Sequence, residues 1–247
     1  MGVLDELKQQ AGKAQAGPRQ QQASQEGQHA IIERRLMTRM DDLHAYFKEF
    51  QQQLNLVNPE ITGDFYITDL CTLKNLRQEG YQVTSDNADG VRKFTFHYAR
   101  AGKGLREVRL PNKLIAEQKR ENLWRYGFKF KLKEYSPNRC ALLIEAYVPV
   151  SFEFEADVER AAIRLKVKNK PMPGISTYIY DADQIDAEFM DEVAKYVLEK
   201  PNRFDELSGN TVPEDTLVRI RRKLKREKKK GRGAKPSLKE KLFRRKA

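Results

Sequence analysis

Most of the side chains in this sequence that could hold a ligand are basic, and they gather near its C-terminal end. Nine lysines and arginines occupy the twelve positions from 219 to 230. A block of this kind repels itself in water, and binding to a polyanion relieves the repulsion and releases condensed counterions. Phosphate contacts position a protein without reading bases, so the pattern predicts non-specific electrostatic binding. The predicted contact residues are Arg219, Arg221, Arg222, Lys223, Lys225, Arg226, Lys228, Lys229, Lys230, Arg232, Arg244 and Arg245.

The charge is divided unevenly along the chain of 247 residues, whose net charge is +12. Residues 216–247 contain 16 Lys/Arg and two Asp/Glu, a net charge of +14, so the remainder carries −2. This asymmetry bears on partners and not on the fold. We expect residues 211–247 to form a basic tail, helical at first and then disordered. Its expected partner is DNA, RNA or a nucleoprotein particle, bound without sequence preference.

A second set of cations lies on segments that alternate like strands. In "WRYGFKFKLK", residues 124–133, large apolar side chains alternate with basic ones, and "AAIRLKVKN" repeats the pattern. If the two strands are neighbours, their basic side chains form a cationic strip that tracks a phosphate backbone. The favoured interpretation is instead a solvated face neutralised across strands by Glu145, Glu153 and Glu155. The basic residues are Arg125, Lys129, Lys131, Lys133, Arg164, Lys166 and Lys168.

Residues 30–57 have the spacing of an amphipathic helix that ends at Asn58-Pro59. Its apolar positions are separated alternately by four and three residues, the repeat of a coiled-coil seam. The seam predicts either a protein partner, such as a second copy of the chain, or a helix packed on its own sheet. Two large Phe residues and a short seam favour the second interpretation. The seam residues are Leu36, Met40, Leu43, Phe47, Phe50 and Leu54.

Catalysis and cofactor binding find little support in the sequence. The three histidines, His29, His44 and His97, have no metal-ligand spacing, and there is no CxxC pair. Phosphate-binding loops and hydrolase motifs such as GxSxG are also missing. We therefore expect a protein that is not an enzyme and that holds no metal or other cofactor.

The remaining patterns predict an α+β fold in one globular domain over residues 29–205, after a flexible leader rich in Gln and Ala at residues 1–28. Residues 62–180 predict an antiparallel meander of seven or eight strands, because period-two alternation gives one buried and one wetted face. "NKLIAEQKREN" is expected as a short helix between strands. A second amphipathic helix is predicted at residues 183–200, capped by Asp183 and stopped by Pro201.

The longest apolar run, "CALLIEAYVPV", contains Glu145 and is shorter than the ~20 residues that span a bilayer. The chain is therefore expected to lie in the cytoplasm, at the nucleoid, or in the nucleus of a eukaryote. An alternative role is that of an adaptor or scaffold that uses helix 30–57, with the tail localising it to an anionic membrane surface or another acidic partner.

Overall fold

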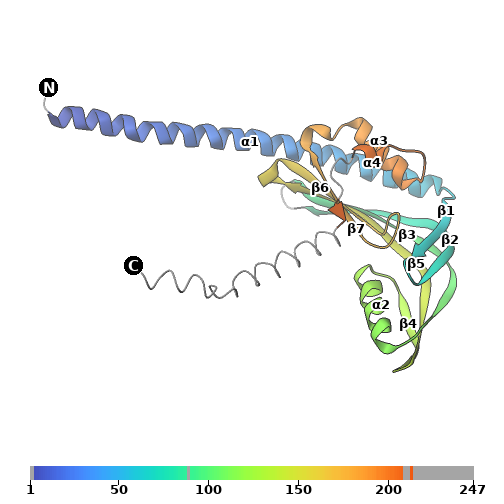
Figure 1. Ribbon diagram of the computed structural model, residues 1–247. Coiled ribbons are helices and arrows are strands. Elements are labelled where there is room, and N and C mark those ends of the chain that lie inside the picture. Colours follow the sequence, from blue (N-terminus) through green and yellow to red (C-terminus); the bar gives the residue numbers. More distant parts are fainter. Residues whose placement is uncertain (1–2, 88–89, 208–211, 214–247) are drawn as a thin grey trace, which may run out of the picture.

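The protein is built around one twisted sheet with three long strands at its centre. In the computed structural model, which describes residues 3–87, 90–207 and 212–213, eight antiparallel strands run in the order β1-β2-β3-β5-β6-β7-β8, and β4 pairs with β5 (Figure 1). The predicted α+β class and antiparallel sheet are confirmed. The strands are β1 Thr62–Ile67, β2 Cys71–Asn87, β3 Val91–Leu110, β4 Phe130–Ser136, β5 Arg139–Asp157, β6 Ala162–Lys168, β7 Ile175–Asp181 and β8 Val212–Pro213. The helices are α1 Val3–Val57, α2 Lys113–Arg125, α3 Ala187–Val197 and α4 Phe204–Leu207, with 3-10 turns η1 Val158–Arg160 and η2 Ala182–Gln184.

Alternation along the central strands gives the sheet one aromatic, buried face. Phe94 of β3 lies opposite Phe154 of β5, and Phe96 lies opposite Phe152. The rings of Phe94 and Phe154 stack with their centroids 4.8 Å apart, and all four side chains are buried. Side chains of successive residues point to opposite faces, so the residues between them lie on the other side of the sheet.

Helix α1 covers this inner face through the seam found in the sequence. Leu36, Met40, Leu43 and Phe47 are completely buried, and the Phe47 centroid lies 5.0 Å from that of Phe154. Phe50 is half-buried and contacts Phe96. The interpretation as a helix on its own sheet is therefore confirmed, and the seam is not a free surface for a partner. The reason is that the sheet already supplies aromatic side chains that fill the spaces along the seam.

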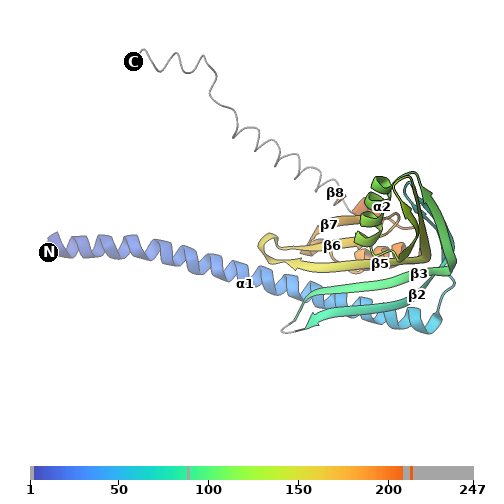
Figure 2. The same cartoon turned by 90° about the horizontal axis from the view of Figure 1, so that it is seen from below.

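The flexible leader expected at residues 1–28 stays a prediction. In the structure helix α1 begins at Val3 and continues without a break to Val57. The N-terminal part of α1 extends beyond the sheet (Figures 1 and 2).

Helix α3 closes the inner face beside α1. Ile185, Phe189, Val193 and Val197 are buried, as the apolar stripe predicted. The helix starts later than expected, because Asp186 and not Asp183 caps it, accepting a hydrogen bond of 2.8 Å from the Phe189 backbone N–H. Residues 182–184 form η2 instead, with the capping box between Asp181 and Gln184.

Strands β3 and β5 continue past the main sheet into a smaller unit, residues 103–145, which we call the flap. The register of β3 on β5 shifts between Ala101 and Leu105, so the strands change direction there. In the flap, α2 packs on the ends of β3 and β5 and on β4 (Figure 1). Buried side chains of Leu123, Leu142 and Ile144 form its core.

The predicted strand at residues 124–133 is wrong in its first half. Helix α2, expected from "NKLIAEQKREN", runs on to Arg125, and β4 begins only at Phe130. The sequence pattern here was ambiguous. Leu123 and Tyr126 are both buried, and their spacing of three residues also fits one face of a helix. Gly127 ends the helix with φ at 78°, a conformation that favours glycine, and donates a hydrogen bond to the Trp124 carbonyl.

The burial of the seam makes a stability prediction. Phe47→Ala should lower the free energy of unfolding by about 3–5 kcal/mol, because it opens a cavity among the rings of the inner face. Leu56→Ala is the matched control on the same helix, since Leu56 is 80% exposed. Urea denaturation at several protein concentrations measures both. If the urea midpoint depends on protein concentration in the wild type but not in Phe47→Ala, the seam is instead an interface between copies of the chain.

Candidate nucleic-acid interface

One face of the sheet is turned away from α1 and α3 (Figure 2), and we call it the open face. Cross-strand pairing places rows of mainly polar side chains on it. Antiparallel register places cross-strand partners on the same side of a sheet. The first row consists of Gln82, His97, Ser151 and Lys168 on β2, β3, β5 and β6. The second consists of Thr84, Thr95, Glu153, Lys166 and Thr177, and the third of Lys93, Glu155, Arg164 and Ile179.

The opposite charges in the second and third rows neutralise one another. The Lys166 ammonium lies 2.8 Å from Glu153, and Arg164 donates to Asp157 at 2.6 Å. Burial works to lower the pKa of Lys166, but its hydrogen bond to Glu153 and the charges of Glu153 and Glu155 outweigh that effect and raise it. This part of the sheet therefore matches the neutralised face that the sequence favoured, with Asp157 in the place expected for Glu145.

Lys168 is the exception. Burial lowers its pKa, and it forms no ion pair with any residue that the structure describes. Its side chain lines a groove of about 540 Å³ on the open face, together with His97, Tyr147 and Ser151. Glu79 also lines the groove, on the far strand β2. A half-buried ammonium without a carboxylate partner gains most from an anionic ligand, because the ligand supplies the missing countercharge.

The flap is fixed against this groove by its turn after α2. Asn169, which is fully buried, donates hydrogen bonds to the carbonyls of Tyr126 at 2.9 Å and of Pro149 at 2.7 Å. A Cβ atom on Gly127 would lie 3.2 Å from Pro149 Cγ and 3.4 Å from Lys168 Nζ. The C-terminal turn of α2 therefore lies directly beside Lys168.

The flap adds positive charge to this region. Residues 103–145 contain 11 Lys/Arg and five Asp/Glu, a net charge of +6, so the chain outside the flap and residues 216–247 carries −8. Lys129 lies 4.2 Å above the Tyr147 ring, which lines the groove. Lys131 is exposed and forms no ion pair with the described residues, whereas Lys133 pairs with Glu107. The sequence did not reveal this concentration because it emerges only when the flap is seen as a unit.

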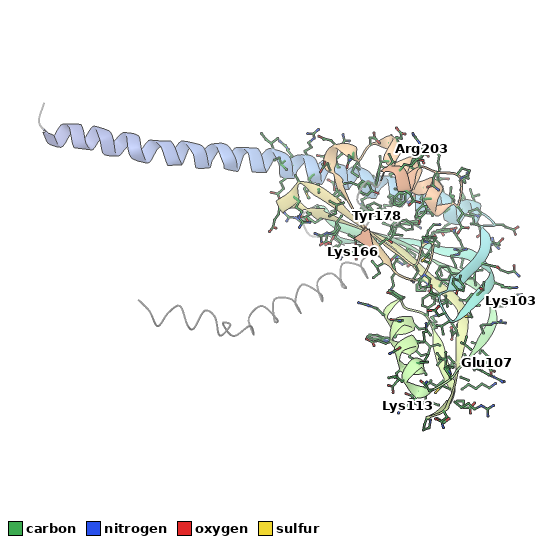
Figure 3. The ribbon with its side chains drawn as sticks, in the orientation of Figure 1. Lys103, Glu107, Lys113, Lys166, Tyr178 and Arg203 are labelled. Carbon is green, nitrogen blue, oxygen red and sulfur yellow. The ribbon has the colours of Figure 1, made fainter. Side chains whose placement is uncertain are left out.

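The seven basic residues predicted as one strip divide between two places. Strand β4 pairs with residues 139–144 of β5, and β6 pairs with residues 151–157, so the two strands are not neighbours. Arg125 belongs to α2 rather than to a strand. Figure 3 shows the flap, marked by Lys113 of α2, apart from Lys166 on the main sheet. Of the seven, Lys168 lines the groove, and Lys129 lies over the ring of Tyr147, which also lines it.

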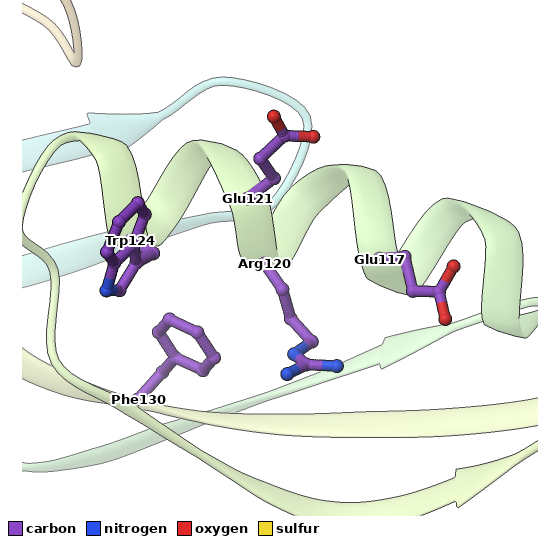
Figure 4. A pocket seen from close by; sticks show the side chains of 5 residues that line it. All are labelled: Glu117, Arg120, Glu121, Trp124 and Phe130. Atoms are coloured by element: carbon purple, nitrogen blue, oxygen red, sulfur yellow. The ribbon is translucent and has the colours of Figure 1, made fainter.

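Trp124 is the most exposed aromatic side chain near the groove. It was predicted to lie on a buried strand face, but on the last turn of α2 it is 78% exposed. It lines a pocket of about 400 Å³ with Glu117, Arg120, Glu121 and Phe130 (Figure 4). Helical spacing of Leu123 and Tyr126, followed by Gly127, is the sequence signal that could have identified its position.

A second cluster of perturbed groups is buried on the inner face. Lys170 is 6% exposed, with Nζ 3.3 Å from the Val197 carbonyl and 3.7 Å from Glu199. Arg100 pairs with the same carboxylate at 3.3 Å. Burial lowers the pKa of Lys170 to about 8, although the charge of Glu199 opposes this. The cluster ties the end of α3 to the sheet, and solvent reaches its amine poorly.

His44 and His97, the histidines whose side chains the structure describes, do not form a site together. His97 lies on the open face with Nε2 3.1 Å from Gln82, whereas His44 on α1 packs against Phe94 on the opposite side of the sheet. Burial lowers the pKa of His44. Within the described residues, no group of three His, Cys, Asp or Glu side chains is placed to hold a metal ion.

The predicted contact residues of the basic tail, from Arg219 to Arg245, lie outside the described residues. The chain is last described in β8, where Val212 pairs with Thr177 of β7. Thr177 belongs to the second row of the open face, so the chain leaves the sheet at the edge of that face.

None of the helices in the described part of the chain is both long and apolar enough to cross a bilayer. Comparisons with protein-family models, with curated proteins and with solved structures found no match to this chain.

The buried amine of Lys170 predicts how stability depends on pH. Its folded-state pKa of about 8 lies below that of the unfolded chain, so between these values the unfolded state binds more protons. The free energy of unfolding should therefore rise with pH, by about 2 kcal/mol between pH 8 and 10. Lys170→Met should abolish this rise in urea titrations at each pH.

Lys195→Met is the control for that experiment. Hydrogen bonds to Asp191 and Glu192 raise the pKa of Lys195, so it stays protonated over this range in both states. The rise in stability should persist in Lys195→Met. A rise that also persists in Lys170→Met would show that another group titrates.

Proposed function

We propose that this protein is a non-catalytic accessory protein that binds DNA, RNA or a nucleoprotein particle without sequence preference. The polybasic segment at residues 216–247 supplies most of the attraction, and the flap with Lys168 supplies a second contact on the folded domain. The proposed setting is the cytoplasm or nucleoid, or the nucleus if the organism is a eukaryote.

The observation that carries the proposal is the partition of charge. The tail holds +14, the flap +6 and the rest of the chain −8. A chain that needed charge only for solubility would gain more from acidic residues. Two separate concentrations of cations on a chain whose remainder is acidic fit a polyanionic ligand, which draws its affinity from counterion release.

The geometry of the domain supports the use of both cationic segments by one ligand. The described chain ends at Pro213, beside Thr177 at the edge of the open face. Thr177 pairs across strands with Lys166 of β6. Lys168, two residues further along β6, lines the groove near the start of the flap. We therefore propose that a strand of nucleic acid bound by the tail also contacts the groove.

A binding role fits the folded domain better than catalysis. The amine with the most lowered pKa, that of Lys170, is engaged with Val197 and Glu199 and is 6% exposed. His97 and His44 lie on opposite faces of the sheet, so neither has the other as an acid–base partner. The adaptor alternative loses its main support, since the seam of α1 is buried within the domain.

Removal of the tail tests the proposal. Full-length protein and a protein of residues 1–213, which keeps all the described strands, are titrated with a labelled oligonucleotide at several salt concentrations. With about 6–10 phosphate contacts, the affinity of the full chain should fall by roughly 10³–10⁵ between 50 and 200 mM salt. The shortened protein should bind weakly and with a shallow salt slope.

Either of two results would count against this assignment. If the full chain binds no oligonucleotide but binds vesicles of anionic lipid, the tail is a membrane-localising segment. If residues 1–213 bind as tightly as the full chain, the folded domain and not the tail carries the function.

Lys168 and Lys166 give a matched test of the groove. Each lysine is replaced by Gln in its own variant of the full-length chain, so the two variants lose the same charge. Lys168→Gln should weaken binding about equally for all sequences and lower the salt slope by about one, as expected for one phosphate contact. Lys166→Gln should leave the slope unchanged, because Glu153 and Glu155 already neutralise that side chain. Equal losses would mean that only overall charge matters.

A further inference from the structure

Trp124 is held in a defined position but leaves its ring free. Its carbonyl accepts a hydrogen bond of 3.0 Å from the Gly127 N–H, which fixes the end of α2. The side chain is 78% exposed, and among the described residues its ring contacts no other aromatic ring and its indole N–H has no hydrogen-bond partner. It is the single tryptophan of the chain.

An exposed tryptophan in this position contributes little to the stability of the fold. Leu123, its neighbour on α2, is 1% exposed and anchors the helix to the flap core, so Trp124 is not needed for that contact. Large aromatic side chains release the most free energy when a partner covers them. Trp124 is therefore better explained by something that packs on it than by the fold alone.

The pocket beside Trp124 is shaped by a second ring and a guanidinium. In Figure 4 the Phe130 ring lies below the indole, and Arg120 lies between Phe130 and Glu117. Arg120 Nε is buried without a hydrogen-bond partner, and its guanidinium lies 5.5 Å from the Tyr135 ring centroid. The pocket thus offers two flat surfaces, the Phe130 ring and the Arg120 guanidinium.

The charges around the pocket determine which part of a nucleotide fits it. The lining carboxylates Glu117 and Glu121 disfavour a phosphate inside the pocket. Carboxylates accept hydrogen bonds from the exocyclic amino group of a base such as cytosine. Two cations lie on adjoining segments: Lys129 comes directly before Phe130 in the sequence, and Lys168 lies beside Gly127. The arrangement suits a base in the pocket and phosphates over the surrounding lysines.

We infer that the ligand of this surface is single-stranded nucleic acid and that an unpaired base stacks on Trp124, within the pocket that Phe130 and Arg120 complete. This inference rests on the proposed function and narrows its ligand class. In a duplex the base faces are covered by their neighbours, whereas single strands present them to aromatic side chains. Stacking of this type tolerates any base, in keeping with a charge-driven binder that reads no sequence.

The experiment uses full-length protein, a labelled single-stranded oligonucleotide of about 20 nucleotides, the same sequence annealed to its complement, and heparin as a polyanion without bases. Trp124→Ala should weaken binding of the single strand by roughly 5- to 140-fold, which corresponds to the loss of one stacked base. Heparin binding should not change. Trp124→Phe should retain most of the affinity, because it keeps an aromatic face.

Two further readouts make the result specific. Binding of the single strand should quench the tryptophan fluorescence of the wild type, and the signal is assigned without ambiguity because the chain has one Trp. Leu114→Ala is the matched control, since Leu114 is exposed on the first turn of the same helix. It should leave all affinities unchanged. Thermal denaturation checks that each variant remains folded.

The outcomes separate this inference from the function on which it rests. If the single strand binds without quenching and Trp124→Ala binds as well as the wild type, stacking is ruled out while nucleic-acid binding stands. If the duplex binds as tightly as the single strand, the preference for unpaired bases is ruled out. If neither the oligonucleotides nor heparin bind, both the inference and the proposed function fail.

Discussion

The packing of α1 on the aromatic inner face of the sheet is the contact on which the other elements depend. Phe47 reaches Phe94, Phe96 and Phe154 at once, with ring centroids 5.0 to 6.1 Å apart. Because this face is filled by α1 and α3, the charged residues that alternate with the aromatic ones must all leave the sheet on the open face. The inner packing therefore determines where polar chemistry can occur.

The two long strands β3 and β5 extend from the main sheet into the flap. They pair from Lys93 and Glu155 in the main sheet to Leu110 and Cys140 at the far end of the flap. A unit joined by two continuous strands and by the buried side chain of Asn169 is held more firmly than one joined by a loop. The groove, Lys168 and the end of α2 consequently keep a fixed geometry.

Some of this arrangement could be predicted from the sequence and some could not. Segments whose period was unambiguous, such as "AAIRLKVKN" at residues 161–169 and the amphipathic helix α3, have buried side chains on the face that the pattern predicted. Residues 124–133 misled because alternating large side chains also satisfy the last turn of a helix, and the turn at Gly127 was not recognised.

The candidate site illustrates the same limit. Basic residues were identified individually, and the favoured view that glutamates neutralise them holds for Arg164 and Lys166. It does not hold for Lys168, because pairing across strands depends on register, which a single sequence does not specify. Trp124 escaped notice for the related reason that its exposure follows from where α2 ends.

Charge is also separated across the thickness of the molecule. Residues 181–206, which include α3 and α4, contain nine Asp/Glu and three Lys/Arg, whereas the flap has a net charge of +6. In Figure 1 these two regions lie on opposite sides of the main sheet. Exposed charges separated by more than the Debye length, about 10 Å at 0.1 M salt, are largely screened from each other. Each side therefore presents its own local charge, so the flap would attract a polyanion and the acidic α3 side would repel it, as the proposed function requires.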